Sequence, residues 1–287
     1  MKIDYFRGRH PNFGDDLNLW LWHRLIPDFF DEDPRVVFLG IGSILGEKQY
    51  PPGTRKIVFG AGYVPEYHAR PNLDSPDWKV YFLRGPRTAR ALGMPPELAL
   101  GDPGMLVGHL VREPAAARAG VALMPHWESM ERGRWPDACR HAGIRLIDPR
   151  DPVDTVIEAI RGSEMVLCEA MHGAIVADAL RVPWVPLLPL NHVHRNKWLD
   201  WTETLSLTLS RRRLLPSSLE EARLWVLRKP VTLSPFAAGI EERLAALAAR
   251  RLRALARTEP NLSADSRFRE LTSRMLEKAD LLRRDYS

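Results

Sequence analysis

Short apolar runs of strand-forming residues alternate with helical stretches along most of this 287-residue chain. Such alternation is typical of α/β proteins, in which helices cover a parallel sheet. The runs are rich in apolar residues, as expected of strands that are buried on both faces. Strands are predicted at 3–6, 36–40, 56–60, 80–84 and 98–101, and again at 121–125, 145–147, 165–168 and 184–187.

The residues that start and stop helices place them between these strands. A helix over Asp16–Leu25 ends before Pro27, because the residue that precedes a proline is driven out of the helical region. A short helix over Arg87–Leu92 is stopped by Gly93. Further helices are predicted at 136–142, 153–161 and 173–180.

The character of the sequence changes between Gly108 and Gly120, and we place a domain boundary there. The prediction is a pair of Rossmann-like domains, 1–115 and 116–216, in a GT-B-like arrangement, followed by a helical tail, 217–287. Helical spacing in the tail predicts an apolar face that packs on the body, although contact with an anionic membrane stays open. This face comprises Ile240, Leu244, Leu247, Ala248 and Leu255.

Composition narrows the classes of partner and the cellular location. The net charge of +5 suits anionic partners, but no DNA-binding motif is present, so we expect no nucleic acid. No run approaches the roughly 18 apolar residues of a membrane span, and the N-terminus lacks a signal-peptide pattern, which predicts a cytoplasmic protein. Cys139 and Cys168 lack metal-ligand spacing and are predicted to be buried thiols, and no metal site is expected.

Ligands of parallel α/β sheets bind beyond the carboxyl ends of the strands, so chemistry is expected in the loops that follow them. The first such loop carries Asn12, Gly14, Asp15 and Asp16 before a helix. A helix N-terminus binds anions, but two carboxylates oppose a phosphate and are better suited to sugar hydroxyls or to a general base. The alternative is a capped loop without a ligand.

The next three loops of the first half offer amides and cations. Two Gly-x-Gly sequences end at Gly42 and Gly62, where glycine lets amides face a ligand or lets two loops pass closely. Arg84 and Arg87 follow the fourth strand and are suited to a carboxylate or phosphate. The alternative is a salt bridge, for example with Asp102.

In the second half, two histidines follow predicted strands. His126 comes after the strand at 121–125, where a structural histidine is the common alternative. His172 comes after the strand at 165–168, immediately before Gly173 and a helix, so an anionic ligand is favoured beside it. The loop that carries His172 therefore gives the most informative indication of a functional site in the chain.

Taken together, these loops resemble the polysaccharide pyruvyltransferase family, and most closely its exopolysaccharide, succinoglycan-type members. Each piece is short, so the specificity lies in the ordered set, which spans roughly the first two-thirds of the chain. The pieces are 12–15, the two Gly-x-Gly loops, 84–88, 101–103, 125–126 and 171–177.

The resemblance implies a GT-B-like fold, phosphoenolpyruvate as the donor substrate and no cofactor. It also implies a hexose acceptor on a lipid-linked oligosaccharide at the cytoplasmic face of the membrane. The residues that match Arg84 and His172 belong to the donor site of the family. Many relatives carry arginine where this chain has Ala170, and Arg87 and Arg195 are candidates to replace that contact.

We hypothesise that Arg84 binds the donor carboxylate while His172 and the helix that starts at Gly173 hold the phosphate. A histidine protonates the enol methylene, and an aspartate deprotonates a sugar hydroxyl. The catalytic candidates are therefore His172, His126, Asp15 and Asp16. Two alternatives stay open: a GT-B glycosyltransferase that uses a nucleotide sugar, and a non-catalytic polysaccharide assembly or binding protein.

Overall fold

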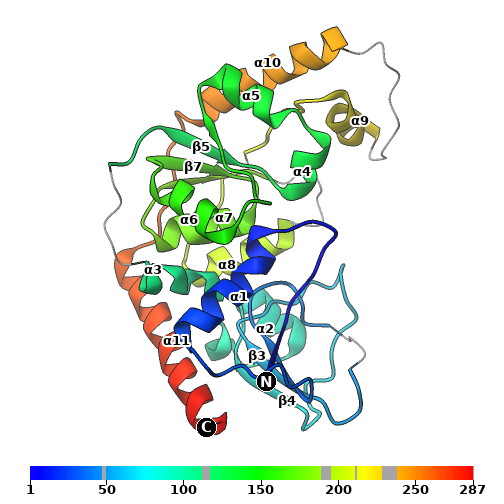
Figure 1. Cartoon of the computed structure of the whole chain (residues 1–287), viewed down its shortest axis with the longest axis vertical. Helices are drawn as coiled ribbons and strands as arrows, with labels where there is room; N and C mark the ends of the chain where they lie inside the picture. The colour runs from blue at the N-terminus through cyan, green and yellow to red at the C-terminus, as the bar shows by residue number, and fades with distance from the viewer. Residues whose placement is uncertain (47–49, 112–116, 189–194, 211, 228–237, 287) are drawn as a thin grey trace. The chain divides into compact units, whose positions relative to one another are not determined.

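The computed structural model describes residues 1–46, 50–111, 117–188, 195–210, 212–227 and 238–286 (Figure 1). The chain divides into two compact units. Unit 1 comprises Met1–Arg112, Val193–Leu209 and Ser263–Ser287, and unit 2 comprises Glu113–His192 and Ser210–Leu262. These units interleave along the sequence, whereas the sequence analysis placed its domains in consecutive segments, and the segment predicted as a tail contributes to both.

Unit 1 contains a four-stranded sheet in which every pair of neighbours is parallel. Its order, β1-β2-β3-β4, follows the sequence without a reversal. Aromatic rings pack against it: the Trp22 ring lies 4.9 Å from Phe38, and Phe59 lies 4.7 Å from Phe82, both edge to face. The strands are β1 (Lys2–Asp4), β2 (Val36–Leu39), β3 (Arg55–Phe59) and β4 (Trp78–Phe82).

The fifth strand predicted at 98–101 is wrong. Pro96–Leu98 forms a 3-10 helix, η1, and Ala99 makes only an isolated parallel bridge with Leu83. The Leu83 amide donates to Leu98 O at 2.7 Å, so the segment still borders β4. A proline nitrogen has no hydrogen to donate and its φ is fixed, so a segment that contains Pro96 cannot form a continuous strand. Only a single bridge forms before the chain turns away from the sheet.

Helices of unit 1 come from three parts of the sequence. α1 begins at Phe13, earlier than predicted, and α2 ends before Gly93, whose φ of +68° is the left-handed conformation expected there. The last helix, α11, reaches back to β4, where Lys79 Nζ lies 2.6 Å from Asp285. The helices are α1 (Phe13–Leu25), α2 (Pro86–Leu92), η2 (Pro103–Leu106), α3 (Val107–Leu110), α8 (Arg195–Thr204) and α11 (Asp265–Tyr286).

Unit 2 contains a second parallel sheet, ordered β6-β5-β7-β8. Its four strands lie where the sequence predicted them. The chain leaves β5 toward β6 and returns to pair β7 on the other side, so the order reverses between β5 and β7. The strands are β5 (Val121–Met124), β6 (Arg145–Leu146), β7 (Met165–Cys168) and β8 (Trp184–Pro186).

The sheet of unit 2 lies between α5 and α10 on one face and α6 and α7 on the other (Figure 1). Right-handed crossovers place helices on opposite faces when the strand order reverses. Cys139 and Cys168 are buried in this unit, as predicted. The helices are α4 (Trp127–Arg132), α5 (Trp135–Ala142), α6 (Val153–Arg161), α7 (Met171–Ala179), α9 (Leu219–Leu227) and α10 (Ala238–Leu255).

The apolar face predicted for the tail is only partly correct. α10 packs on α5, as a body-packing helix should, but Ile240 and Leu247 are 53% and 46% exposed. Alanines let two helix backbones approach closely, and this selects a different stripe of α10 as the contact. The buried stripe comprises Ala245, Ala248, Ala249, Leu252 and Leu255. None of the helices among the described residues is long and apolar enough to span a membrane.

Candidate functional site

The loops that follow β5 and β7 meet at the carboxyl edge of unit 2, because these strands are paired with Met124 opposite Cys168. Crevices outside the carboxyl ends of strands, at the point where the order reverses, are the usual ligand sites of open α/β sheets. Two predicted catalytic residues, His126 and His172, follow these two strands. The β5/β7 edge is therefore the candidate site of unit 2.

His126 is held in place by the loop after β7. Glu169 is buried, and its carboxylate accepts the His126 amide at 2.9 Å and the Ser129 hydroxyl at 3.0 Å. The ring Nδ1 of His126 accepts the Glu128 amide at 3.4 Å, so the N-cap of α4 is a histidine. A neutral ring with Nδ1 as acceptor carries its proton on Nε2, where it can be donated.

His172 is the second residue of α7, which begins at Met171, two residues before the predicted start, and the side chain is half-buried. The N-cap residue is Ala170, whose side chain makes no capping hydrogen bond. The first amides of a helix have no partner within it, and their dipoles favour anions. The predicted helix-terminal position of His172 is confirmed.

Gly173 has a packing role in this structure. A Cβ at Gly173 would lie 2.5 Å from Met124 Sδ, and its amide donates to Ala170 O at 3.1 Å. Glycine is therefore needed for close contact between α7 and β5. The predicted access of a ligand to this amide is not what the described conformation offers, because the amide is already engaged.

A second buried carboxylate lies close to the β5/β7 edge. Glu221 of α9 accepts hydrogen bonds from the Ser217 amide and hydroxyl at 2.8 and 2.7 Å and from Trp135 Nε1 at 2.9 Å. Burial, together with the negative charge of Glu169, raises the pKa of Glu221 to about 7 against the lowering effect of these donors. Unit 2 thus contains a carboxyl group that titrates near neutral pH.

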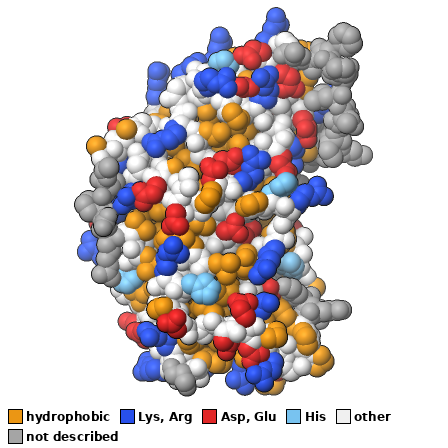
Figure 2. All heavy atoms as spheres, viewed as in Figure 1, with side chains coloured by type: hydrophobic (Ala, Val, Ile, Leu, Met, Phe, Trp, Pro, Cys, Tyr) orange, Lys and Arg blue, Asp and Glu red, His pale blue; other side chains and the backbone are white. Residues whose placement is uncertain are grey.

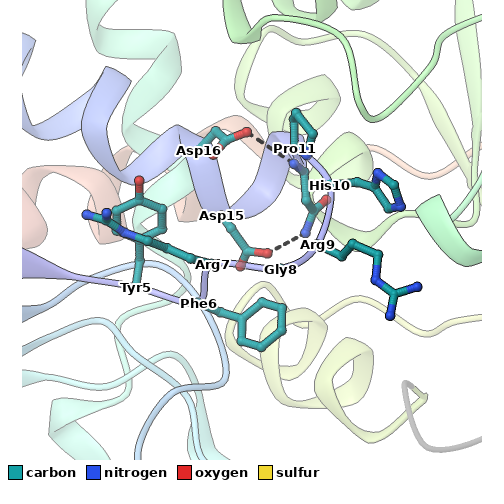
Figure 3. Close-up of a pocket in the computed structure, with 10 residues that line it drawn as sticks. Tyr5, Phe6, Arg7, Gly8, Arg9, His10, Pro11, Asp15 and Asp16 are labelled. Atoms are coloured by element: carbon teal, nitrogen blue, oxygen red, sulfur yellow. Dashed lines mark hydrogen bonds between the residues drawn. The ribbon is translucent and has the colours of Figure 1, made fainter.

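In unit 1, a cavity of about 290 Å³ is formed by the loop after β1 and the first turn of α1 (Figure 3). Asn12 is the N-cap of α1, and its backbone amide donates to Asp16 Oδ2 at 3.1 Å. The Asn12 side-chain amide donates to Asp15 Oδ2 at 2.5 Å. These carboxylates already complement the positive end of the helix, so this end favours hydroxyls over a phosphate.

The two Gly-x-Gly loops lie side by side at the carboxyl edge of unit 1. The Gly62 amide donates to Gly42 O at 2.8 Å, and a Cβ at Gly62 would lie 2.1 Å from Arg84 Cζ. Gly42 has a φ of +125°, a conformation that side chains rarely adopt. Of the two roles considered from sequence, these glycines perform the close passage of loops.

Arg84 is fully buried and forms an ion pair within unit 1. Its Nε donates to Asp200 Oδ2 at 3.0 Å, and its Nη1 donates to Ser43 Oγ at 2.7 Å. Asp200 also accepts the Arg87 amide and both the amide and hydroxyl of Thr88. The guanidinium thus has no surface that a solute reaches in this conformation, in contrast to its predicted contact with a donor.

The alternative partner considered for Arg84, Asp102, is wrong, because Asp102 accepts the Gly104 amide at 2.9 Å and caps η2. Arg87 is exposed and pairs with Glu203 at 2.6 Å. Arg195 is the first residue of α8 and is half-buried. These residues all belong to unit 1.

A comparison with known proteins decides the family. The chain is 36% identical to the succinoglycan biosynthesis protein ExoV of Rhizobium meliloti (strain 1021) over an alignment of 317 positions, which covers the whole of both chains. The chain belongs to the ExoV family. No protein-family profile and no solved structure matches it. This exopolysaccharide biosynthesis family agrees with the broad class that the ordered loops predicted.

The predicted residues of this ExoV-family protein fall into two groups. His126, His172 and Gly173 lie at the carboxyl edge of unit 2. The others lie in unit 1, where they form two clusters, the cavity and the Arg84 loops. The cavity cluster comprises Asn12, Asp15 and Asp16, whereas Gly14 is buried in the first turn of α1 and does not line the cavity. The other cluster comprises Gly42, Gly62, Arg84 and Arg87, with Arg195 on α8.

Three polar residues were missed by the sequence analysis. Asn18 is buried on α1 and joins it to the first Gly-x-Gly loop, with the Ile41 amide donating to its Oδ1 at 2.8 Å. Asp200 and Glu169 organise the loops after β4 and β7. Glu169 alone carried a signal, since a carboxylate directly after an apolar strand needs buried donors. Among the described residues, no His, Cys, Asp and Glu cluster could hold a metal ion.

Proposed function

We propose that this ExoV-family protein is a transferase that moves the enolpyruvyl group of phosphoenolpyruvate onto two hydroxyls of a sugar in an exopolysaccharide repeat unit. The observation that carries the proposal is the pairing of β5 with β7, which brings the His126 and His172 loops to one reversal point. The family and the ordered resemblance of the loops support the substrate class. The GT-B-like arrangement of the two units is part of the same proposal.

The donor brings about three negative charges in a small volume, so its site must supply several donors or cations. The N-terminus of α7 and the imidazole of His172 meet this need at one end of the β5/β7 edge. Ala170 supplies no side-chain contact, and Arg195 and Arg87 remain candidates for the missing cation. We assign the phosphate to the α7 end and the proton donor to His172 or His126.

The reaction then proceeds in balanced steps. The imidazolium donates a proton to the methylene carbon of the enol, and C2 gains positive character. One sugar hydroxyl attacks C2 and loses its proton to a base, the C2–O bond to phosphate breaks, and a second hydroxyl closes the ketal. Of the two protons released by the hydroxyls, one replaces the proton given to the methylene carbon and the other leaves on the phosphate, so the products are the ketal and hydrogen phosphate. Asp15 and Asp16 remain the candidate bases, and the cavity that they line suits hydroxyl groups.

Arg84 enters this proposal as a positioning residue. Its buried pairing with Asp200 joins the loop after β4 to α8, and Ser43 joins the same guanidinium to the first Gly-x-Gly loop. Loops in fixed positions hold the substrate groups in the geometry that the reaction needs, and small displacements of these loops lower the rate strongly. A loss of Arg84 is therefore expected to act through the loops.

We also propose that the protein works at an anionic membrane surface, where a lipid-linked oligosaccharide would be met, on the cytoplasmic side. The outward stripe of α10 carries Ile240, Arg243, Leu247 and Arg250, all exposed. Lys and Arg side chains gather at the end of unit 2 where α5 and α10 lie (Figure 2). An aliphatic and cationic stripe supports interfacial binding.

The test is incubation of the full chain with a candidate oligosaccharide and phosphoenolpyruvate. Mass spectrometry should detect the mass gain of a pyruvate ketal, accompanied by one phosphate for each ketal. UDP- and GDP-sugars serve as competing donors. Transfer of a sugar from a nucleotide would replace the proposal with a glycosyltransferase, and binding of the oligosaccharide with no donor used would indicate an assembly or binding protein.

A further inference from the structure

The cavity of unit 1 has two chemically different sides. One side is the first turn of α1, with the carboxylates of Asp15 and Asp16, and the other is the loop after β1, with Arg7 and Arg9 (Figure 3). Carboxylates that can accept hydrogen bonds from hydroxyls and cations that can bind an anion are thus present within one cavity of about 290 Å³. This volume suits one sugar ring with a substituent.

The acidic side suits hydroxyl groups. Asp16 uses Oδ2 to accept the Asn12 amide, and its Oδ1 makes no hydrogen bond with the described residues. A carboxylate accepts through both oxygens, so Asp16 retains capacity for a ligand O–H. The half-buried position of Asp16 makes a charge-assisted hydrogen bond stronger than at an open surface.

The basic side is not neutralised by these carboxylates. Arg9 is exposed and makes no hydrogen bond or ion pair with the described residues, and Arg7 stacks on the Tyr5 ring at 4.9 Å. The guanidinium groups of Arg7 and Arg9 point away from each other on opposite sides of the loop (Figure 3). A single guanidinium is suited to the planar, bidentate recognition of a carboxylate or a phosphate. Arg9 is therefore the cation that remains available to an anion.

An aromatic ring completes the cavity. Phe6 is 58% exposed, and a Cβ at Gly8 would lie 3.2 Å from its ring, so glycine keeps the loop close to the ring. A large exposed aromatic side chain in a cavity lining offers an apolar face, which the C–H face of a pyranose can cover. Hydroxyl acceptors, cations and an aromatic face are thus combined in one short segment, 5–16.

We propose that this cavity binds an acidic saccharide: a hydroxylated ring whose hydroxyls meet Asp16 and whose carboxylate or phosphate substituent meets Arg9. The inference rests on the proposed function for its place in the reaction, since it names the acceptor as an anionic sugar. Its binding chemistry is independent of phosphoenolpyruvate.

Binding is measured by ligand-observed NMR titration of the full chain with glucose, glucuronate, glucose 1-phosphate and inorganic phosphate, without phosphoenolpyruvate. Glucuronate and glucose 1-phosphate should bind about tenfold more tightly than glucose, and their ratio identifies the preferred substituent. Arg9→Ala should remove this preference and leave glucose unchanged, whereas Asp16→Asn should weaken all three sugars. Arg55→Ala, an exposed arginine at the amino end of β3, should change nothing.

Equal binding of glucose and both anionic sugars would overturn the inference, and so would anionic preference that survives Arg9→Ala. Binding of inorganic phosphate as tight as that of glucose 1-phosphate would also overturn it, because the ring would then contribute nothing. The proposed function fails separately: a chain that binds acidic sugars as described but never forms a ketal refutes pyruvyl transfer and leaves the cavity assignment intact.

Discussion

The two parallel sheets of this protein differ in strand order, and the difference distinguishes the proposed donor site from a more tightly packed edge. In unit 1 the order β1-β2-β3-β4 has no reversal, and the loops after β2 and β4 are joined by buried side chains, notably the pair between Arg84 and Asp200, while the cavity lies at the loop after β1. In unit 2 the order β6-β5-β7-β8 reverses between β5 and β7, and His126 and His172 lie in the segments that follow these two strands. A reversal leaves a crevice that a sequential order does not.

The largest expected effect breaks the chemistry of unit 2. His172→Ala should lower ketal formation by a hundredfold or more, the usual contribution of a general acid, with the thermal unfolding midpoint little changed because the side chain is half-buried. The rate is measured by mass spectrometry of the acceptor. His141→Ala, an exposed histidine of the same unit that pairs with Glu242, is the control. Retained activity in His172→Ala would remove this residue from the mechanism.

The next effect breaks the scaffold of unit 1. Asp200→Ala leaves the Arg84 guanidinium buried without its counter-charge, and removal of one partner from a buried pair costs about 3–5 kcal/mol of unfolding free energy. Urea denaturation followed by circular dichroism measures this loss. Glu203→Ala on the same helix removes only the exposed pair with Arg87 and should cost less than about 1 kcal/mol. Equal effects of both substitutions would contradict a structural role confined to the buried pair.

A third prediction uses pH to test the buried carboxyl group of unit 2. The pKa of Glu221 in the folded protein, about 7, lies above its ordinary value of 4.5, so the native state holds a proton that the unfolded chain releases. Stability therefore falls as the pH rises between these values. Glu221→Gln removes this titration, and the free energy of unfolding of the variant relative to wild type should rise by about 3 kcal/mol across the window.

The measurement is urea denaturation at pH 4.5, 5.5, 6.5 and 7.5. The readout is the change with pH in the stability difference between Glu221→Gln and wild type. The part that does not change with pH reflects lost hydrogen bonds, since glutamine cannot accept all three that Glu221 accepts. Glu164→Gln, an exposed position of unit 2, is the control and should show no pH-dependent difference. A difference for Glu221→Gln that stays the same from pH 4.5 to 7.5 would contradict the raised pKa, because the group would then titrate alike in the folded and unfolded states.

The smallest effect concerns the outer surface of unit 2. Substitution of Ile240 and Leu247 together by serine should weaken binding to vesicles of phosphatidylcholine with phosphatidylglycerol about threefold, and added salt should weaken the wild type further. Vesicle sedimentation measures it. Leu19→Ser on α1 of unit 1 is the matched control, since Leu19 is also exposed. Equal binding of all variants would remove the membrane proposal.

Local pattern was sufficient to predict the strands of both sheets and the start of α7 to within two residues. Strands covered on both faces are apolar along their whole length, and this property is readable without the fold. The start of α1 was missed by three residues because Asp15 and Asp16, which suggested caps, belong to its first turn and bond back to Asn12. A carboxylate at a helix start fits both positions.

Strand order and long-range partners were beyond the sequence. The same alternation of strands and helices fits a sequential and a reversed sheet, since crossovers decide the order. The fate of Arg84 was equally hidden, because its partner Asp200 lies 116 residues away in a helix that gave no sign of contact. The residue type of Arg84 correctly indicated an anionic partner, but only the fold shows that this partner is Asp200.

Hydrogen–deuterium exchange of the full chain with and without phosphoenolpyruvate tests most directly whether the reversal in unit 2 is the donor site. Amides of 126–130 and 170–173 should exchange more slowly when the donor is present, with the 7–16 loop of unit 1 unchanged. Protection confined to unit 1, or none at the β5/β7 edge at saturating donor, would contradict the account.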